Sequence, residues 1–288
     1  MKNAMFACAV SMAAALTFEA EGDGWNQFRG PNGSGVAPPS YRPPLELGEK
    51  QIAWKAPVPP GLSSPSLSDD RVFLTAVEGG RLVTLAFEKA TGELAWRREA
   101  PDVPLEKVHQ TSSPAASTPL VDSERVYVYF GSYGLICYDH NGEQQWSKPI
   151  PTPESLYGMS TSPIAYRDTL ILVLDNDADL PGSRLSQSKI VALKRSDGEL
   201  VWEAERPQHR SAWSTPIIWR HDKGEELVVL GNGRARSYDP ASGAENWFVG
   251  GFSRETIAVP VAGGGRVYIA SAQLGGGADA KIDPEPFW

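Results

Sequence analysis

Cysteine is scarce in this sequence: only two of the 288 residues are cysteines, Cys8 and Cys137. Cys8 lies inside an N-terminal apolar stretch, and removal of that stretch would leave a single cysteine, which cannot form an internal disulfide. Cys137 lies in the apolar run from Gly134 to Tyr138. We therefore expect a small buried core residue at this position and not a nucleophile.

Positive charge is also in deficit. The chain has 27 Lys and Arg against 35 Asp and Glu, for a formal net charge of −8. Nucleic acids and anionic membranes both require a basic patch, so neither is expected as a partner. The 41% of hydrophobic residues and 22% of charged residues instead suit a packed globular core.

Long apolar runs are missing after the first residues. Lys2 precedes an apolar stretch from Ala4 to Leu16, which is too short to span a membrane as a mature helix. We predict a signal peptide over residues 1–20 and export to the periplasm or the extracellular space. No transmembrane segment is expected in the mature chain. A buried N-terminal helix is the alternative interpretation.

Metal-ligand patterns are weak. No metal-ligand spacing connects the four histidines, which are His109, His140, His209 and His221. The most metal-like cluster is Asp175, Asp177 and Asp179, whose carboxylates alternate along the chain. Leu180 and Ser186 stand where a calcium-binding EF-hand loop requires Gly and Glu. We therefore favour a structural role for these aspartates at the end of a strand.

Catalytic fingerprints are absent from the sequence, which contains no Gly-x-Ser-x-Gly, Walker or His-Glu-x-x-His motif. Gly231-Asn-Gly233 lacks the third glycine of a dinucleotide fingerprint and is predicted to be a hairpin turn. No catalytic residue is assigned.

A tryptophan repeat is what the sequence does contain. In four segments a glycine lies four residues before a tryptophan: Gly92 and Trp96, Gly142 and Trp146, Gly198 and Trp202, and Gly243 and Trp247. The spacings between these tryptophans are 50, 56 and 45 residues. This period is typical of one four-stranded propeller blade.

Each glycine–tryptophan motif follows the same upstream pattern. A Ser/Thr-Pro pair and then a run of β-branched or aromatic residues precede every copy, and a fifth copy begins at Val259-Pro260. The sequence therefore predicts an all-β fold, a β-propeller of four-stranded antiparallel blades. The predicted blades are residues 63–98, 115–149, 158–204 and 212–250, with a partial blade at 257–272.

The motif residues have a structural interpretation. Between two strands, the glycine is expected to adopt a positive φ in a hairpin connection, with Asp bonding nearby backbone donors. Glu88 and Lys194 replace Asp in two copies, whereas Asp139 and Asp239 keep it. The tryptophans are predicted to pack against neighbouring blades, contributing about 2–3 kcal/mol each by burial, and not to bind a ligand.

These segments resemble the docking motif Ala-x-Asp-x-x-Thr-Gly-x-x-x-Trp of the pyrroloquinoline-quinone (PQQ)-like β-propeller repeat family. The segment Trp25–Gly35 resembles the entry segment of exported bacterial proteins that carry these repeats. The resemblance extends from Trp25 to Ala272. The family includes quinoprotein dehydrogenases and a non-enzymatic scaffold for assembly of outer-membrane β-barrels.

The resemblance implies one of two functions. The first is a non-catalytic protein-binding or assembly scaffold whose partners are envelope or secreted proteins. The alternative is a dehydrogenase of alcohols or sugars that depends on PQQ and calcium. Many such enzymes place adjacent cysteines on the quinone, and this chain has none. The scaffold is therefore preferred, and no cofactor is assigned.

The number of repeats raises the question of ring closure. The resemblance implies seven or eight blades, whereas about four and a half are present, so we predict a chain truncated at its C-terminus. Residues 21–62 are predicted as a Pro/Gly-rich lead-in, with a lone strand at 51–55 of the kind that completes the last blade. The alternative is a small five-bladed ring in which residues 51–55 pair with the strands at 258–270.

The propeller hypothesis also suggests where a site lies. His109, His209 and Trp213 fall just before Ser/Thr-Pro strand starts. In a propeller such connections line one mouth of the central channel, so a site at this mouth is a hypothesis for the structure to test.

Overall fold

The structure, a computed structural model, describes residues 24–37, 39, 41–46, 48–177, 184–207, 211, 213–231, 233–252 and 256–271. The predicted signal peptide, Asp179 and His209 lie outside the described residues, as does everything after residue 271. The described chain is almost entirely strand and connecting loop, with three short 3-10 turns at Pro31–Gly33, Glu49–Gln51 and Leu185–Gln187.

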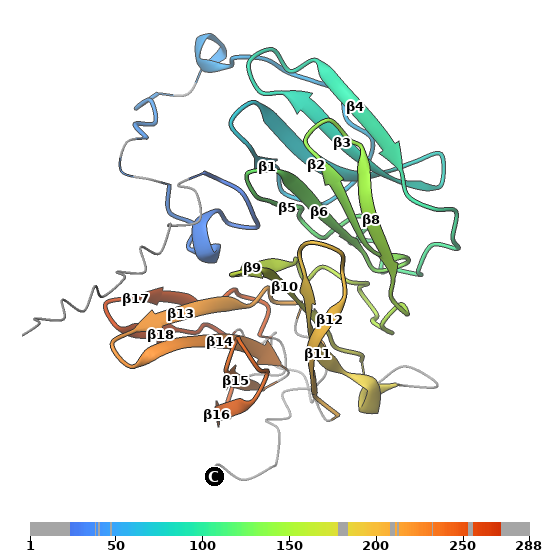
Figure 1. The fold of residues 1–288 in the computed structure, drawn as a ribbon. Helices are drawn as coiled ribbons and strands as arrows, with labels where there is room; N and C mark the ends of the chain where they lie inside the picture. Colours follow the sequence, from blue (N-terminus) through green and yellow to red (C-terminus); the bar gives the residue numbers. More distant parts are fainter. Residues whose placement is uncertain are drawn as a thin grey trace, which may run out of the picture.

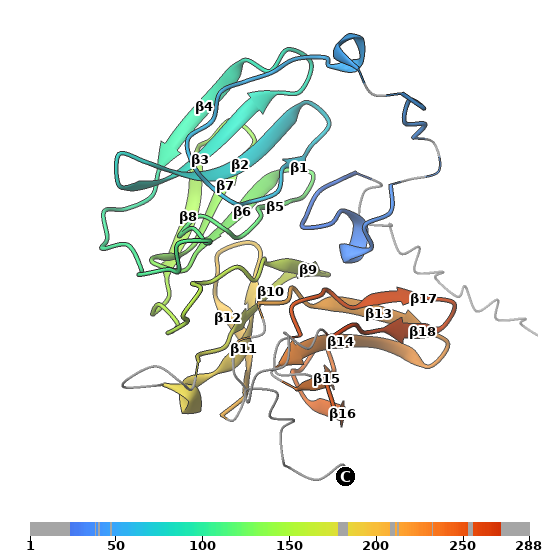
Figure 2. The ribbon, with the colours of Figure 1, turned by 180° about the vertical axis from the view of Figure 1, so that it is seen from behind.

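Four four-stranded antiparallel sheets follow one another in an arc (Figures 1 and 2). Blade 1 consists of β1 (Ser66–Leu67), β2 (Arg71–Glu78), β3 (Arg81–Glu88) and β4 (Leu94–Glu99). Blade 2 consists of β5 (Leu120–Val121), β6 (Arg125–Phe130), β7 (Gly134–Asp139) and β8 (Gln144–Pro149). Blade 3 consists of β9 (Ile164–Tyr166), β10 (Thr169–Leu174), β11 (Lys189–Lys194) and β12 (Leu200–Glu205). Blade 4 consists of β13 (Ile217–His221), β14 (Gly224–Gly231), β15 (Arg234–Tyr238) and β16 (Glu245–Val249).

A two-stranded hairpin of β17 (Val261–Gly263) and β18 (Arg266–Tyr268) follows blade 4. In every four-stranded sheet the strands are ordered as in the sequence, each pairing with the next. The third and fourth strands of every blade share a register shift near the end of the third strand. The predicted all-β fold of four-stranded antiparallel blades is confirmed.

The tryptophans of the fourth strands join neighbouring blades. Trp96 of β4 lies on the Gly142 turn of blade 2, where a Cβ atom on the glycine would be 2.7 Å from the indole ring. The same contact joins Trp146 to Gly198 and Trp202 to Gly243. Gly142 has a φ of +80°, so the position demands glycine both for its backbone conformation and for the close approach of the ring.

Each of these indole N–H groups donates to an equivalent carbonyl in the next blade, that of the residue directly after the Asp position of the turn. The bonds run from Trp96 to His140 at 2.9 Å, from Trp146 to Arg195 at 3.0 Å and from Trp202 to Pro240 at 3.1 Å. The polar atom of each ring is thereby satisfied while its apolar body is buried. Trp247 differs, because its indole N–H donates to the carboxylate of Glu226 in the same blade, at 2.6 Å.

The lead-in supplies a fifth tryptophan of the same kind. Trp54 lies against Gly92 in the first turn of this type, and its indole N–H donates to the carbonyl of Lys89 at 2.9 Å. Trp54 and Ala56 pack against blade 1, beside Leu85 and other core residues. Within the described residues, the segment 51–55 has no β-ladder partner. Trp54 thus makes the docking contact without belonging to a strand.

Local side chains explain why the Asp of the turn can vary. Asp139 Oδ1 accepts the backbone N–H groups of Asn141 and Glu143, at 2.9 and 2.8 Å. Where Glu88 replaces Asp, the hydroxyl of Thr91 instead accepts the N–H of Glu93 at 3.2 Å. In the Lys194 turn, Asp197 accepts the N–H of Glu199 at 2.9 Å. A residue within the turn therefore takes over the capping role of the Asp.

The Ser/Thr-Pro pairs form a series of hydrogen bonds, each from one blade to the next, just before the first strand of each blade. We name this series the hydroxyl chain. The backbone N–H of Ser64 donates to Thr118 Oγ1 at 3.0 Å, and that of Thr118 donates to Ser162 Oγ at 3.0 Å. The N–H of Ser162 then donates to Thr215 Oγ1 at 3.1 Å. Val259, the equivalent residue of the fifth copy, has no hydroxyl with which to extend the hydroxyl chain.

The two ends of the blades differ, and we name them the turn face and the connection face. The turn face carries the β1–β2 and β3–β4 turns and their equivalents, which touch one another: Lys89 N–H donates to Asp70 O at 2.9 Å, and Arg195 N–H to Asp168 O at 2.8 Å. The connection face carries the β2–β3 turns and the segments that lead from each blade to the next.

The lead-in binds the inner strands near the turn face. The N–H of Leu67 donates to Trp25 O and that of Val121 to Asn26 O, both at 2.8 Å. The side chain of Asn32 pairs with Ile218 of β13, accepting its N–H at 3.0 Å and donating to its carbonyl at 2.7 Å. Leu67, Val121 and Ile218 are equivalent positions of blades 1, 2 and 4. The lead-in therefore bridges the arc from blade 1 to blade 4 (Figure 1).

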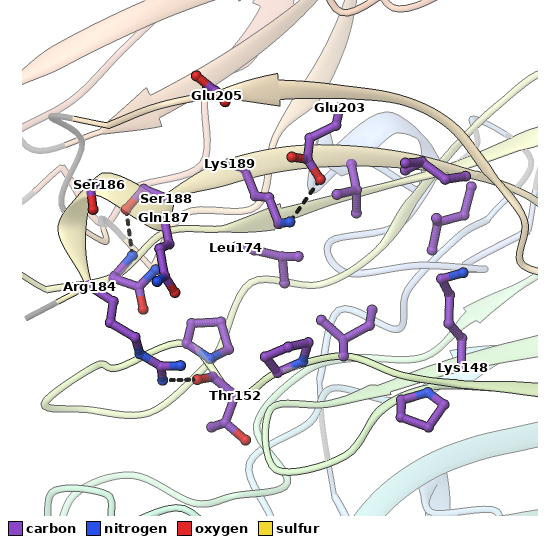
Figure 3. Close-up of a pocket in the computed structure, with 18 residues that line it drawn as sticks. Lys148, Thr152, Leu174, Arg184, Ser186, Gln187, Ser188, Lys189, Glu203 and Glu205 are labelled. Carbon is purple, nitrogen blue, oxygen red and sulfur yellow. Dashed lines mark hydrogen bonds and ion pairs between the residues drawn. The ribbon is translucent and has the colours of Figure 1, made fainter.

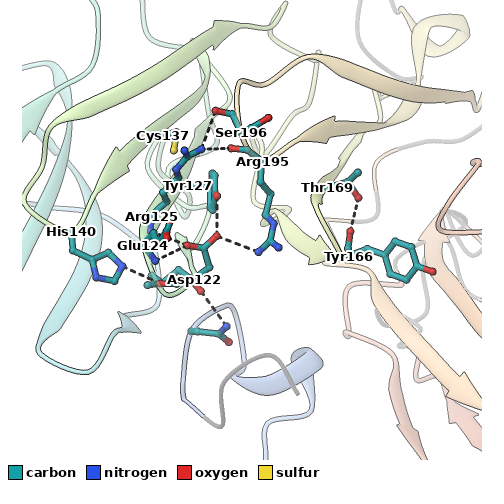
Figure 4. A network of polar contacts seen from close by, with 12 residues as sticks. Asp122, Glu124, Arg125, Tyr127, Cys137, His140, Tyr166, Thr169, Arg195 and Ser196 are labelled. Atoms are coloured by element: carbon teal, nitrogen blue, oxygen red, sulfur yellow. Dashed lines mark hydrogen bonds and ion pairs between the residues drawn. The ribbon is translucent and has the colours of Figure 1, made fainter. Parts of the chain in front are cut away.

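Polar contacts strengthen the turn face between blades 2 and 3 (Figure 4). The Arg125 guanidinium donates to the carbonyls of Arg195 and Ser196, both at 2.9 Å. Asp122 accepts from the Tyr127 hydroxyl at 2.9 Å and forms an ion pair with Arg195 at 3.2 Å. These bonds tie β6 of blade 2 to the β11–β12 turn of blade 3.

The docking contact is tested by Gly142→Ala. Its Cβ would displace the Trp96 ring and the residue would keep an unfavourable positive φ, so we expect the free energy of unfolding to fall by about 2–4 kcal/mol. Gly79→Ala is the matched control, because Gly79 has a φ of +56° but no atom within 4 Å of the added Cβ. This control is expected to lose only about 1 kcal/mol in urea unfolding. Equal losses for the two variants would contradict the docking role.

Candidate functional site

Three aromatic side chains meet on the connection face, and we name them the aromatic row. The ring of Tyr157 lies 5.0 Å from that of His109 and 5.2 Å from that of Trp213, in an edge-to-face arrangement with Trp213. The three residues come from three successive connections between blades, and all are half-buried. The structure thus brings His109 and Trp213 together through Tyr157, which the sequence analysis did not identify.

Trp213 has an uncommon backbone conformation. Its φ is +56°, a region that bulky side chains rarely adopt. Its indole N–H donates to the hydroxyl of Ser155 at 2.9 Å, which fixes the ring beside Tyr157. Backbone strain of this kind concentrates at functional positions, so Trp213 marks the aromatic row as a candidate site.

Glu106 lies behind the aromatic row in a cradle formed by two glycines. Its carboxyl Oε2 accepts the N–H of Met159 at 3.3 Å, and its own N–H donates to Ser132 Oγ at 2.9 Å. A Cβ atom on Gly131 would collide with Oε1, which is buried and has no hydrogen-bond partner among the described residues. Burial raises the pKa of Glu106 to about 7.

The hydroxyl of Tyr129 is a second buried polar group without a hydrogen-bond partner in the described part of the chain. Tyr129 belongs to β6 and is 1% exposed. Burial raises the pKa of Tyr129, and the nearby Glu106 raises it further. The sequence alone does not indicate Glu106 and Tyr129 as a pair, because no local motif distinguishes Glu106 from a glutamate on the surface.

The metal-like aspartates have protein partners. Asp175 forms a bidentate ion pair with Arg206, with Nε to Oδ1 at 2.9 Å and Nη2 to Oδ2 at 3.0 Å. Arg206 also donates to the Tyr238 hydroxyl at 2.7 Å, and both charged side chains are almost fully buried. Burial raises the pKa of Asp175, and the guanidinium opposes this shift. The pair lies at the ends of β10 and β12 within blade 3, and the bond from Arg206 to Tyr238 of β15 joins it to blade 4.

Asp177 and Asn176 hold the connection that carries Tyr157. Asp177 Oδ2 accepts the N–H of Leu156 at 2.9 Å, and Asn176 Oδ1 accepts the N–H of Glu154 at 2.7 Å. Among the described residues, no group of three His, Cys, Asp or Glu side chains is placed to hold a metal ion. Asn176 and Asp177 therefore position the connection that carries Tyr157 of the aromatic row.

The other residues noted in the sequence have structural surroundings. Cys137 is fully buried in β7, and burial raises the pKa of its thiol to about 12. His140 Nε2 lies 3.0 Å from the carbonyl oxygen of Asp122 on the turn face. His221 Nε2 lies 3.2 Å from Glu226 Oε1 in blade 4. None of these three side chains belongs to the aromatic row.

A cleft of about 480 Å³ opens between blades 2 and 3 (Figure 3), and we name it the proline cleft. One wall is the segment 149–153, in which every second residue is proline. The other wall is the sheet of blade 3, with Leu174, Val191, Leu193 and Leu200. The Lys189–Glu203 ion pair at 2.7 Å lies on this wall. The segment that follows the proline wall carries Tyr157, so the proline cleft and the aromatic row share one connection.

A family model described as outer membrane protein assembly factor BamB matches residues 52–225, which is more than half of the chain. The chain belongs to this family. No curated protein matches the chain significantly. The BamB family match covers blades 1 to 3 and the start of blade 4.

Solved structures share the fold at low identity. A europium-containing methanol dehydrogenase is 16% identical with a TM-score of 0.53, and covers 73% of this chain and 48% of its own. A quinohemoprotein alcohol dehydrogenase from Comamonas testosteroni is 12% identical with a TM-score of 0.50, and the match covers 73% of this chain and 39% of that enzyme. BamB from Moraxella catarrhalis is 16% identical with a TM-score of 0.46, and the match covers 79% of this chain and 58% of that protein. The chain thus spans about half the length of the solved structures it matches.

The described residues do not fit the cation of a quinoprotein dehydrogenase. Both oxygens of Asp175 bind Arg206, and Asp177 accepts a backbone N–H. Among the described residues, Glu106 belongs to no group of three or more His, Cys, Asp or Glu side chains that could hold a metal ion. A cation of this type needs several free oxygen ligands. We therefore derive no reaction step through such a group.

The buried ion pair is tested by Arg206→Met. Removal of the guanidinium leaves the Asp175 carboxylate buried without its partner, so we expect the free energy of unfolding to fall by about 3–5 kcal/mol. Lys194→Met is the control, because it breaks the exposed Lys194–Glu199 pair and should change stability little. Chemical denaturation of both variants measures the difference. A similar loss in both would contradict a structural role for the buried pair.

The raised pKa of Glu106 predicts a pH-dependent stability. Below pH 4.5, its ordinary value, glutamate is protonated in both states, whereas between 4.5 and about 7 only the folded chain keeps the proton. The stability contributed by the neutral carboxyl is therefore lost as the pH rises through 7. Glu106→Gln should be more stable than the wild type at pH 8 by about 2 kcal/mol, after allowance for partial exposure, and should lose this advantage below pH 4.5. Denaturation midpoints of both proteins over pH 4 to 8 measure this difference in stability. A difference between Glu106→Gln and the wild type that does not change with pH would contradict the prediction.

Proposed function

We propose that this chain is a non-catalytic protein-binding scaffold that acts in assembly within the cell envelope. The observation that carries the proposal is the connection face: the aromatic row and the proline cleft lie on one connection, while Asp175 and Asp177 are held by protein groups. Membership in the BamB family supports the same function.

The chemistry of the two features suits a protein partner. Tyrosine and tryptophan are the side chains that most often dominate binding energy at protein interfaces. The Tyr157 and Trp213 rings are held in place, so little side-chain entropy is lost on binding. Prolines have no backbone N–H, so a partner that covers the proline wall leaves few donors unsatisfied there. The connection face is therefore suited to a partner with apolar side chains.

We also propose that the protein is exported and that its partners are envelope or secreted proteins. The apolar stretch from Ala4 to Leu16 supports export. In the part of the chain that the structure describes, no helix has the length and apolar character needed to cross a membrane. The acidic net charge of −8 makes a nucleic acid an unsuitable partner.

The proposal is tested by capture from an envelope extract with the immobilised full-length chain. Each captured protein is then titrated against the wild type and against Tyr157→Ala. We expect at least about tenfold weaker binding by the variant, because an aromatic contact at an interface centre contributes more than 1 kcal/mol. Tyr41→Ala is the matched control, since Tyr41 is an exposed tyrosine of the lead-in, 57% accessible, and lies outside the connection face.

Two outcomes would overturn the scaffold function. The first is capture that is equally strong for wild type and Tyr157→Ala. The second is reduction of an artificial dye by an alcohol or a sugar after addition of PQQ and Ca²⁺, which would support the alternative of a quinoprotein dehydrogenase. Melting curves of both variants show whether a loss of binding is a loss of fold.

A further inference from the structure

Two connections on the connection face run side by side behind the aromatic row. The N–H of His109 donates to the carbonyl of Leu156 at 3.1 Å, and the N–H of Met159 donates to the Glu106 carboxyl at 3.3 Å. A Cβ atom on Gly158, which has a φ of +77°, would collide with the Val108 side chain. The segments 106–109 and 156–159 are therefore held together at both ends, and each carries one ring of the aromatic row.

The Glu106 carboxyl is incompletely hydrogen-bonded in this arrangement. One carboxyl oxygen, Oε1, is buried against Gly131 and has no hydrogen-bond partner in the described chain. No Lys or Arg of the described residues pairs with it, so a negative charge at this place would be stabilised only by the Met159 N–H and the Ser132 side chain, which burial outweighs. The buried hydroxyl of Tyr129 is unpartnered as well. A neutral carboxyl suits the cradle, whereas a carboxylate does not.

The titratable groups around Glu106 come from three elements. Its own connection contributes Lys107, which is exposed, and His109 of the aromatic row. β6 contributes Tyr129, whose pKa Glu106 raises, and the second connection contributes Tyr157. His109 is the ionisable side chain that belongs to the aromatic row itself. Any effect of Glu106 must therefore be separated from that of His109.

We propose that Glu106 is a proton-operated latch that holds the two connections together and thereby sets the geometry of the aromatic row. With the carboxyl neutral, the latch is closed and Met159 stays bound to it. Loss of the proton places a charge in the glycine cradle, and the carboxylate must move out to reach water. The Met159 N–H then loses its acceptor, and Tyr157, two residues earlier, loses the support that fixes it against Trp213. The latch is independent of any partner, so its test stands apart from that of the proposed function.

The test follows the emission of Trp213 across pH 5 to 9 in the full-length chain. The contribution of Trp213 is obtained as the difference between each protein and the same protein with Trp213→Phe. We expect a transition with a midpoint near 7 in the wild type and no such transition in Glu106→Gln, whose amide imitates the neutral carboxyl. His109→Gln, the control for the ionisable side chain within the aromatic row, should keep the transition.

Gly131→Ala tests the cradle itself. The added Cβ takes the space of Oε1, so the carboxyl is expelled toward solvent, Met159 loses its acceptor at every pH and the Trp213 transition should disappear. Amide exchange at Met159 gives a second measurement that does not involve Trp213. Once corrected for intrinsic base catalysis, it should accelerate above pH 7 in the wild type but not in Glu106→Gln. A transition that persists in Glu106→Gln, disappears in His109→Gln or is absent from the wild type would overturn the latch.

Discussion

The contact between an indole ring and a glycine turn of the next blade is the interaction on which this molecule depends. A single four-stranded blade cannot bury both of its faces, so each blade is stable only through its neighbours. Trp54, Trp96, Trp146 and Trp202 all make this contact, and all donate an N–H to the equivalent carbonyl. Because the ring needs only a glycine and a carbonyl, the rest of the turn is free to vary.

Sequence analysis could predict the blades because their signals are local. A glycine four residues before a tryptophan and a Ser/Thr-Pro pair are each visible within a short window. The hydroxyl chain adds a reason for the second signal, since the hydroxyls of Thr118, Ser162 and Thr215 each accept from the preceding blade. The lead-in was harder, because Trp54 makes a docking contact without the strand that the pattern at 51–55 suggested.

The candidate site could be predicted only in part, for a physical reason. His109 and Trp213 were visible as residues of connections, but Tyr157, which lies between them, carries no motif. Asp175 and Asp177 resemble metal ligands in sequence because carboxylates alternate there. Their partners, Arg206 and the Leu156 N–H, are 31 and 21 residues away, and such pairs depend on how strands and connections distant in the sequence come together. The burial that raises the pKa of Glu106 likewise comes from segments distant in the sequence.

The lead-in has a consequence for the order in which the molecule is completed. Asn32 pairs with Ile218, at a sequence separation of 186 residues, and Asn26 pairs with Val121, 95 residues away. A ribosome releases the asparagines first, yet their acceptor peptides are made much later, and contacts of such long range form slowly. The blades can assemble one after another from local pairing. The lead-in, although it is synthesised before the blades, is among the last segments to become fixed. The contact of Asn32 therefore forms only after blade 4 has been synthesised and has folded.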